Sequence, residues 1–152
     1  MAQTTGAISF KAVKVEICAT GTATWTDISG TSNKVSVSGP DRATGEAYTA
    51  AGDNPIVTSG PLGPVEVTVD SVYSEVTGEA FKVLWDLHVA AGGTDVWARW
   101  TPKGTATGDY RFTSGKGIIT KCPPPQGDVG DGKPVMFGFT IKSASLAQAV
   151  AA

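Results

Sequence analysis

Residues 64–73 read Pro-Val-Glu-Val-Thr-Val-Asp-Ser-Val-Tyr, and they give the clearest indication of the fold. Its valines alternate with three polar residues, Glu66, Thr68 and Asp70. Successive side chains of a β-strand point to opposite faces, so the alternation predicts a strand with one apolar and one polar face. Antiparallel sheets commonly bury one face and leave the other in water, and the stretch therefore predicts a strand of such a sheet.

The same period-two pattern recurs on both sides of this strand. It predicts further strands at residues 13–18, 25–28, 34–38, 95–101, 109–113, 117–122 and 134–142. Gly21-Thr22 is the expected turn between the first two of these strands. The chain also contains 19 Thr and 16 Val but only 4 Leu, and β-branched residues favour strands over helices. The sequence therefore predicts a mainly β protein, an antiparallel β-sandwich or barrel-like domain.

Residues 78–91 form a segment with helical periodicity. Apolar side chains recur there at steps of three and four, and charged side chains form a separate stripe. Thr77 is the expected N-cap, and Gly92-Gly93 is the expected stop. We therefore expect one amphipathic helix that flanks the sheet.

Two segments show no periodicity. Residues 40–63 are rich in Gly and Pro, and residues 123–134 begin with three consecutive prolines. We expect residues 40–63 to be a long loop, because loops of that length in compact domains are usually functional or disordered. The triple proline favours an extended backbone.

Size and charge exclude several classes of protein. The chain has 152 residues, with 12 basic and 14 acidic side chains and a formal net charge of −2. Tight binding of duplex DNA requires many Lys and Arg side chains, so this chain is a poor candidate for it. No stretch approaches about 20 apolar residues, so no membrane span is expected. We expect one domain, residues 1–152, with residues 1–12 and 143–152 as flexible or assembly arms.

Residue types that catalysis and metal binding need are scarce. The chain has one histidine, His88, and two cysteines, Cys18 and Cys122. A His/Cys metal cluster or a Cys–His nucleophile is therefore nearly ruled out. His88 lies on the apolar side of the predicted helix and is interpreted as a packing residue with a hydrogen-bond partner. We predict no catalytic residue, no metal and no cofactor, and whether the two cysteines form a disulfide stays open.

The order of the predicted elements resembles that of the tail tube (major tail) proteins of long non-contractile-tailed bacteriophages. The resemblance extends over about residues 12–142. The stretches that carry it are residues 25–29, 65–75, 78–81, 97–102 and 115–123.

This resemblance implies a structural virion protein of the phage tail, made in the host cytoplasm. It implies a homo-oligomer in which six subunits form a ring, and rings stack into a tube that conveys DNA into the host without binding it specifically. Tail terminator, tape measure and baseplate proteins are the implied partners.

Two sets of residues are candidates for contacts in such an assembly. The long loop is suited to reach a neighbouring subunit, and its candidate contact residues are Asp41, Arg42, Glu46, Tyr48, Asp53, Ile56 and Leu62. The polar face of the central strand, Glu66, Thr68 and Asp70, is the candidate lumen face. A neutral or acidic wall suits a conduit, because it does not hold the phosphates of DNA.

Two other functions remain alternatives at this point. A β-sandwich that binds carbohydrate or mediates adhesion would use exposed aromatic side chains, with Trp97 and Tyr110 as candidates. Trp97 and Trp100 alternate to opposite faces of their strand, however, so at most one of them lies on an exposed platform. A capsid decoration protein is the other alternative.

Overall fold

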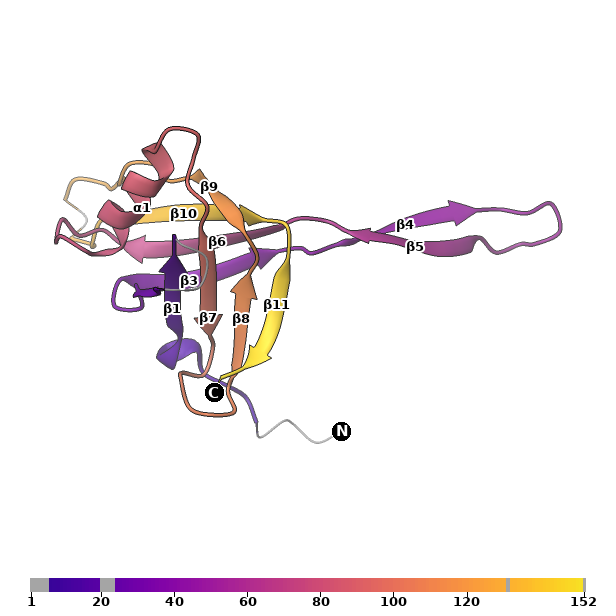
Figure 1. Cartoon of the computed structure of the whole chain (residues 1–152), viewed down its shortest axis with the longest axis horizontal. Coiled ribbons are helices and arrows are strands. Elements are labelled where there is room, and N and C mark those ends of the chain that lie inside the picture. The colour runs from indigo at the N-terminus through magenta and orange to yellow at the C-terminus, as the bar shows by residue number, and fades with distance from the viewer. Residues whose placement is uncertain (1–5, 20–23, 131, 152) are drawn as a thin grey trace.

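The computed structural model describes residues 6–19, 24–130 and 132–151, and it is a β-sandwich with a long projecting arm (Figure 1). Of the two sheets in the body, one has five strands in the order β11-β8-β7-β1-β2. These are β11 (Leu146–Val150), β8 (Tyr110–Ser114), β7 (Trp97–Thr101), β1 (Lys14–Cys18) and β2 (Thr26–Asp27). Each neighbouring pair is antiparallel, and the turn expected at Gly21-Thr22 lies outside the described residues.

The second sheet has four strands in the order β3-β6-β10-β9. They are β3 (Ser32–Ser38), β6 (Val65–Val72), β10 (Met136–Ser143) and β9 (Gly117–Lys121). Figure 1 shows that β1, β7, β8 and β11 cross the direction of β3, β6 and β10. The fold class predicted from the sequence, a mainly β antiparallel sandwich with one helix, is confirmed.

The core lies between the two sheets. The valines of β6 at positions 65, 67 and 69 are fully buried, as their alternation predicts. They pack in one cluster with side chains from both sheets and the helix, which include Val15, Ile17, Leu84, Trp100, Phe139 and Ile141. Burial of this apolar surface is what orders the body, since each large side chain contributes about 1.5–3 kcal/mol.

Helix α1 (Ala80–Val89) flanks the sandwich and is shorter at both ends than the predicted 78–91. Its N-cap is Glu79 rather than Thr77, and that side chain makes no capping hydrogen bond. Gly92 and Gly93 follow the helix with positive φ, as expected of a glycine stop. The helix is fixed by an aromatic contact in which the Phe81 ring meets the Phe137 ring edge-on at 5.1 Å.

Residues 40–63 form a projecting β-hairpin, which we call the arm, and not an irregular loop. Strands β4 (Arg42–Ala47) and β5 (Ile56–Leu62) pair with each other in a separate two-stranded sheet. The arm continues the direction of β3 and β6 away from the body (Figure 1). The loop prediction was wrong because both faces of this hairpin meet water, so neither face carries the apolar alternation that marks a half-buried strand.

The chain ends also take part in the structure. Residues 146–150, which the sequence analysis assigned to a flexible or assembly arm, form β11 and pair with β8. Near the other end, residues 10–12 form a short 3₁₀ turn. Cys122 is a buried free thiol, so it forms no disulfide with Cys18.

Candidate functional site

The base of the arm is set by glycine. Gly39 has a φ of +79°, and a Cβ added to it would lie 2.5 Å from the carbonyl oxygen of Pro64. A side chain at this position is therefore excluded both by backbone conformation and by space. On the other strand, the Gly63 N–H donates to the Asp41 carbonyl oxygen at 2.7 Å. These contacts hold the β3–β4 connection against the β5–β6 connection at the base of the arm.

The two strands of the arm are held mainly by backbone pairing. Thr44 lies opposite Ser59, and Ala47 lies opposite Ile56, with a register shift near Arg42. The Arg42 guanidinium donates to the Gly60 carbonyl oxygen at 2.9 Å. No residue of the arm belongs to the buried core, so the arm is ordered by its own hydrogen bonds.

All seven predicted contact residues of the arm are exposed. They are Asp41 before β4, Arg42 and Glu46 in β4, Tyr48 and Asp53 in the tip, and Ile56 and Leu62 in β5. Tyr48 is 71% exposed and Val57, which the sequence analysis did not select, is 59% exposed. The arm therefore exposes large apolar side chains that the core of this chain does not cover.

The polar sheet face, defined here as the outward side of β3, β6 and β10, contains the three predicted lumen residues. Glu66 lies at 3.3 Å from the Lys142 ammonium, and the Thr68 hydroxyl lies at 3.0 Å from the Thr140 hydroxyl. Asp70 lies opposite Lys34 on β3.

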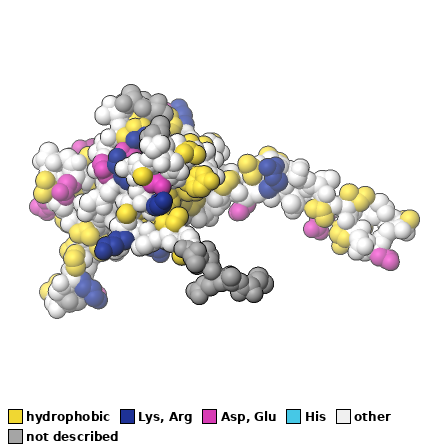
Figure 2. Space-filling view, turned by 90° about the horizontal axis from the view of Figure 1, so that it is seen from below, with side chains coloured by type: hydrophobic (Ala, Val, Ile, Leu, Met, Phe, Trp, Pro, Cys, Tyr) yellow, Lys and Arg dark blue, Asp and Glu magenta, His cyan; other side chains and the backbone are white. Residues whose placement is uncertain are grey.

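The partners of these residues were not predicted from the sequence. Lys34 and Lys142 balance the charges of Glu66 and Asp70, so these two acids and two lysines carry no net charge together. Alternation within one strand shows which side chains share a face, but it does not show which strand lies beside it. Figure 2, which views the molecule from below, shows acidic and basic side chains interspersed over the body.

The outward side of the five-stranded sheet carries a buried ion pair that the sequence analysis did not identify. Arg99 donates to both carboxylate oxygens of Glu16, at 2.6 and 3.0 Å, and Lys14 lies at 3.0 Å from the same carboxylate. The Arg99 guanidinium also stacks on the Trp25 ring, 4.1 Å from its centroid. Burial by itself raises the pKa of Glu16, but the hydrogen bonds and charges of Arg99 and Lys14 outweigh it, so the pKa lies below its ordinary value of 4.5.

This ion pair makes part of the folding stability dependent on pH. Because the pKa of Glu16 is lower in the folded chain, the pair stabilises the fold above about pH 4.5, and the stabilisation is lost as the pH falls through the folded value. We expect Glu16→Gln to lower the free energy of unfolding by about 3 kcal/mol at pH 7, since it leaves Arg99 without its anion. Urea unfolding followed by tryptophan fluorescence measures this.

The difference between Glu16→Gln and the unmodified chain should shrink when the unfolding is repeated at pH 3.5. Asp86→Asn is the matched control, because Asp86 forms an exposed pair with Lys82 on helix α1 and exposed pairs contribute about 1 kcal/mol or less. An equal loss of stability from Glu16→Gln at both pH values would contradict this account of the ion pair.

The aromatic side chains do not form one exposed platform. Trp97 lies on the same side of β7 as Arg99, whereas Trp100 and Phe112 pair across β7 and β8 and stack at 5.7 Å. Tyr110 shares the side of Phe112, so it lies on the face opposite Trp97.

The structure also shows the position of His88 and bears on metal binding and membrane spans. His88 packs between helix and sheet, with Nδ1 at 3.2 Å from the Ile119 carbonyl oxygen, as expected of a packing histidine. Among the described residues, no three His, Cys, Asp or Glu side chains are grouped so that they could hold a metal ion. Within the same part of the chain, no helix has the length and apolar character needed to cross a membrane.

Comparisons with known proteins identify the fold but no sequence family. No family model matches the sequence, and no curated protein is significantly similar to it. Among solved structures, a chain of the extended sheath-tube complex of PVC, an extracellular contractile injection system, has a TM-score of 0.69 at 15% identity. The match covers 98% of this chain and 99% of that one.

Two further structures share the fold. A chain of the PVC sheath/tube terminator has a TM-score of 0.68 at 14% identity, and the match covers 94% of this chain and 96% of that one. A chain of the tail of an empty gene transfer agent particle has a TM-score of 0.64 at 12% identity and matches over 99% and 100% of the two chains. The fold is therefore one found in components of phage-like tails and injection systems. Because it also occurs in a contractile system, the fold does not point to non-contractile tails in particular.

Proposed function

We propose that this protein is a tail tube subunit that assembles into stacked rings of six. The observation that carries the proposal is the shared fold over nearly the whole chain with components of tail and sheath-tube particles. The arm supports it independently, because it displays large apolar side chains that the chain's own core does not use. The tail of the gene transfer agent particle has C6 symmetry, which supports a ring of six.

The stacking contact of the proposed tube is the arm. A ring requires heterologous contacts between subunits, and the same kind of contact repeated along the axis gives a filament. The arm is long enough for this role, because about 10 residues in each direction at about 3.3 Å per residue reach about 30 Å from the body. Its seven exposed contact residues, from Asp41 to Leu62, would then lie against the next ring.

The lumen of the proposed tube is lined by the polar sheet face. Glu66, Thr68 and Asp70 lie there beside lysines that balance the two acids. A wall without net charge does not attract phosphates strongly, so DNA passes without specific binding. In this role the protein is a non-enzymatic part of the virion, made in the host cytoplasm, with terminator, tape measure and baseplate proteins as partners.

Sedimentation velocity tests the proposed ring. As the protein concentration rises, we expect a species of six times the 15.5 kDa of one chain, followed by larger assemblies. A single species of 15.5 kDa at every concentration would contradict the proposal. A discrete trimer would favour a capsid decoration protein instead.

A further inference from the structure

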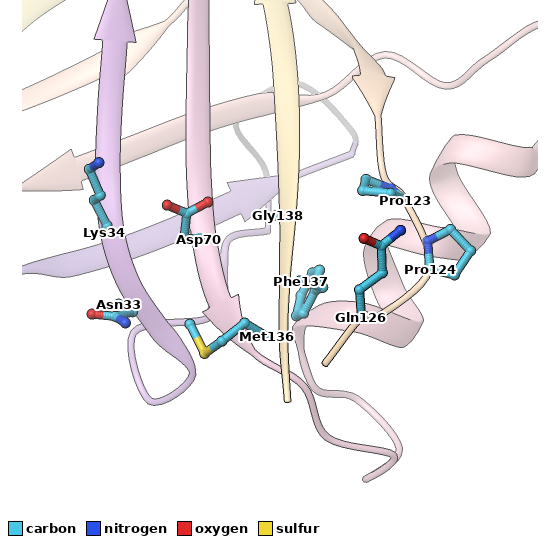
Figure 3. A pocket seen from close by; sticks show the side chains of 9 residues that line it. All are labelled: Asn33, Lys34, Asp70, Pro123, Pro124, Gln126, Met136, Phe137 and Gly138. Carbon is cyan, nitrogen blue, oxygen red and sulfur yellow. The ribbon is translucent and has the colours of Figure 1, made fainter. Parts of the chain in front are cut away.

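A pocket lies at one end of the four-stranded sheet and is open on the polar sheet face (Figure 3). Its volume is about 420 Å³. One wall is the segment after β9, and the floor is made by β3, β6 and β10. The lining includes Asn33, Lys34, Asp70, Pro123, Pro124 and Met136. Gly138 leaves space in the floor of the pocket, because a Cβ at this position would lie 3.0 Å from an Asp70 carboxylate oxygen.

The pocket and the arm lie at opposite ends of the same sheet. Strand β3 begins at Ser32 beside the pocket and enters the arm after Ser38, whereas β6 leaves the arm at Val65 and reaches the pocket at Asp70. Figure 1 shows the arm continuing along the direction of these strands. A contact between the arm of one copy and the pocket of the next is therefore head to tail, and a contact of this kind can repeat along the axis of a tube.

The chemistry of the pocket matches that of the arm tip. Pro123 and Pro124 present ring surfaces without backbone donors, and Met136 adds a flexible apolar side chain that adapts to a partner. The arm tip displays Tyr48 and Ile56, which are 71% and 55% exposed. An aromatic and a branched aliphatic side chain are the groups that such a surface buries well.

The charges of the two surfaces are also complementary. Within the described part of the chain, Lys34 at the mouth of the pocket and Asp53 in the arm tip make no ion pair. From residue 43 to residue 63 the arm contains acids but no Lys or Arg. A cation at the pocket and an anion at the tip therefore fit each other across a contact between two copies.

From these observations we propose that the arm tip of one copy, residues 48–56, binds in the proline-walled pocket of the next copy along the tube. Tyr48 and Ile56 pack against Pro123, Pro124 and Met136, and Asp53 faces Lys34. The proposal rests on the proposed function and deepens it, because it assigns the surface that receives the arm. A second recess, of about 360 Å³ and lined by Tyr110 and Phe112, lies on the five-stranded sheet and is the competing acceptor.

Cysteine cross-linking of the assembled full chain tests the contact. The two native cysteines are buried, so added surface cysteines react selectively. We expect the double variant Asn33→Cys/Asn54→Cys, which places one thiol beside the pocket and one in the arm tip, to give a ladder of linked chains on a non-reducing gel after oxidation. The matched control, Tyr110→Cys/Asn54→Cys, should stay mostly monomeric.

Electron microscopy of the same samples distinguishes an error in the assigned acceptor pocket from an error in the proposed tube function. Tubes together with a ladder from the Tyr110→Cys pair, or with no ladder from the Asn33→Cys pair, would overturn the assigned acceptor and leave the tube function standing. Failure of the unmodified chain to form tubes would overturn the tube function and this inference with it.

A charge exchange gives a second readout. Lys34→Glu and Asp53→Lys should each raise the protein concentration needed for tube formation by about tenfold, a change of about 1.4 kcal/mol per contact. The double variant should return that concentration close to its original value, because it restores opposite charges. Equal and additive effects without restoration would contradict a contact between these two residues.

Discussion

Deletion of residues 44–59 is expected to give a folded protein that no longer stacks into tubes. The deleted residues contribute no side chain to the core, so the sandwich retains its buried surface. The new ends also lie close together, because a Cβ at Gly60 would be 3.0 Å from the Ala43 carbonyl oxygen. Stacking is lost completely because Tyr48, Asp53 and Ile56 are removed together.

Circular dichroism and urea unfolding measure the fold of the deletion variant, and electron microscopy measures stacking. Thr58→Ala is the matched control: it keeps the arm and removes only a side-chain hydrogen bond to the Gly45 carbonyl oxygen, so it should still stack. Tubes formed by the deletion variant would show that the arm is not the stacking element. Loss of the folded signal would show that the arm is needed for folding.

Reversal of one charge on the polar sheet face is expected to convert the proposed tube from a neutral conduit into one that retains DNA. Glu66→Lys lies outside the proposed acceptor pocket and places a lysine beside Lys142, so the face changes from balanced to positive in every subunit. Tubes assembled with short duplex DNA should then hold it in a nuclease-resistant form. Retention should fall by about a thousandfold or more between 50 and 200 mM salt, because binding to phosphates releases counterions.

The location of the retained DNA distinguishes the lumen from the outer surface. Glu75→Lys makes the same change of charge near helix α1, which packs through Phe81 and Phe137 on the buried side of the sheet. DNA held by this control variant should be digested by nuclease. If the Glu66→Lys tubes leave their DNA open to digestion, the polar sheet face does not line the lumen.

The sandwich could be predicted from the sequence because its strands are half buried. In β6 the apolar side chains recur every second residue, and every one of the predicted inward valines is buried. The helix was predicted for the same reason, but its ends were not. The N-cap is Glu79, whose side chain makes no capping hydrogen bond. The general preference for Thr at N-caps therefore pointed to the wrong residue, Thr77.

The hairpin structure of the arm and the pocket proposed as its acceptor could not be predicted from the sequence, for a physical reason. Strands β4 and β5 are exposed on both faces, so selection for burial leaves no periodic pattern in them. The segment was recognised as unusual, and its residues were selected as contacts, but its hairpin structure was not. The pocket combines residues from β3, β6 and β10 with the prolines after β9, and only strand pairing brings these together.

Electron microscopy of the purified full chain shows whether the protein builds a tube. We expect rings with sixfold symmetry and a central channel, stacked into tubes of uniform diameter. A protein that stays monomeric at high concentration, with neither rings nor tubes in the images, would contradict it.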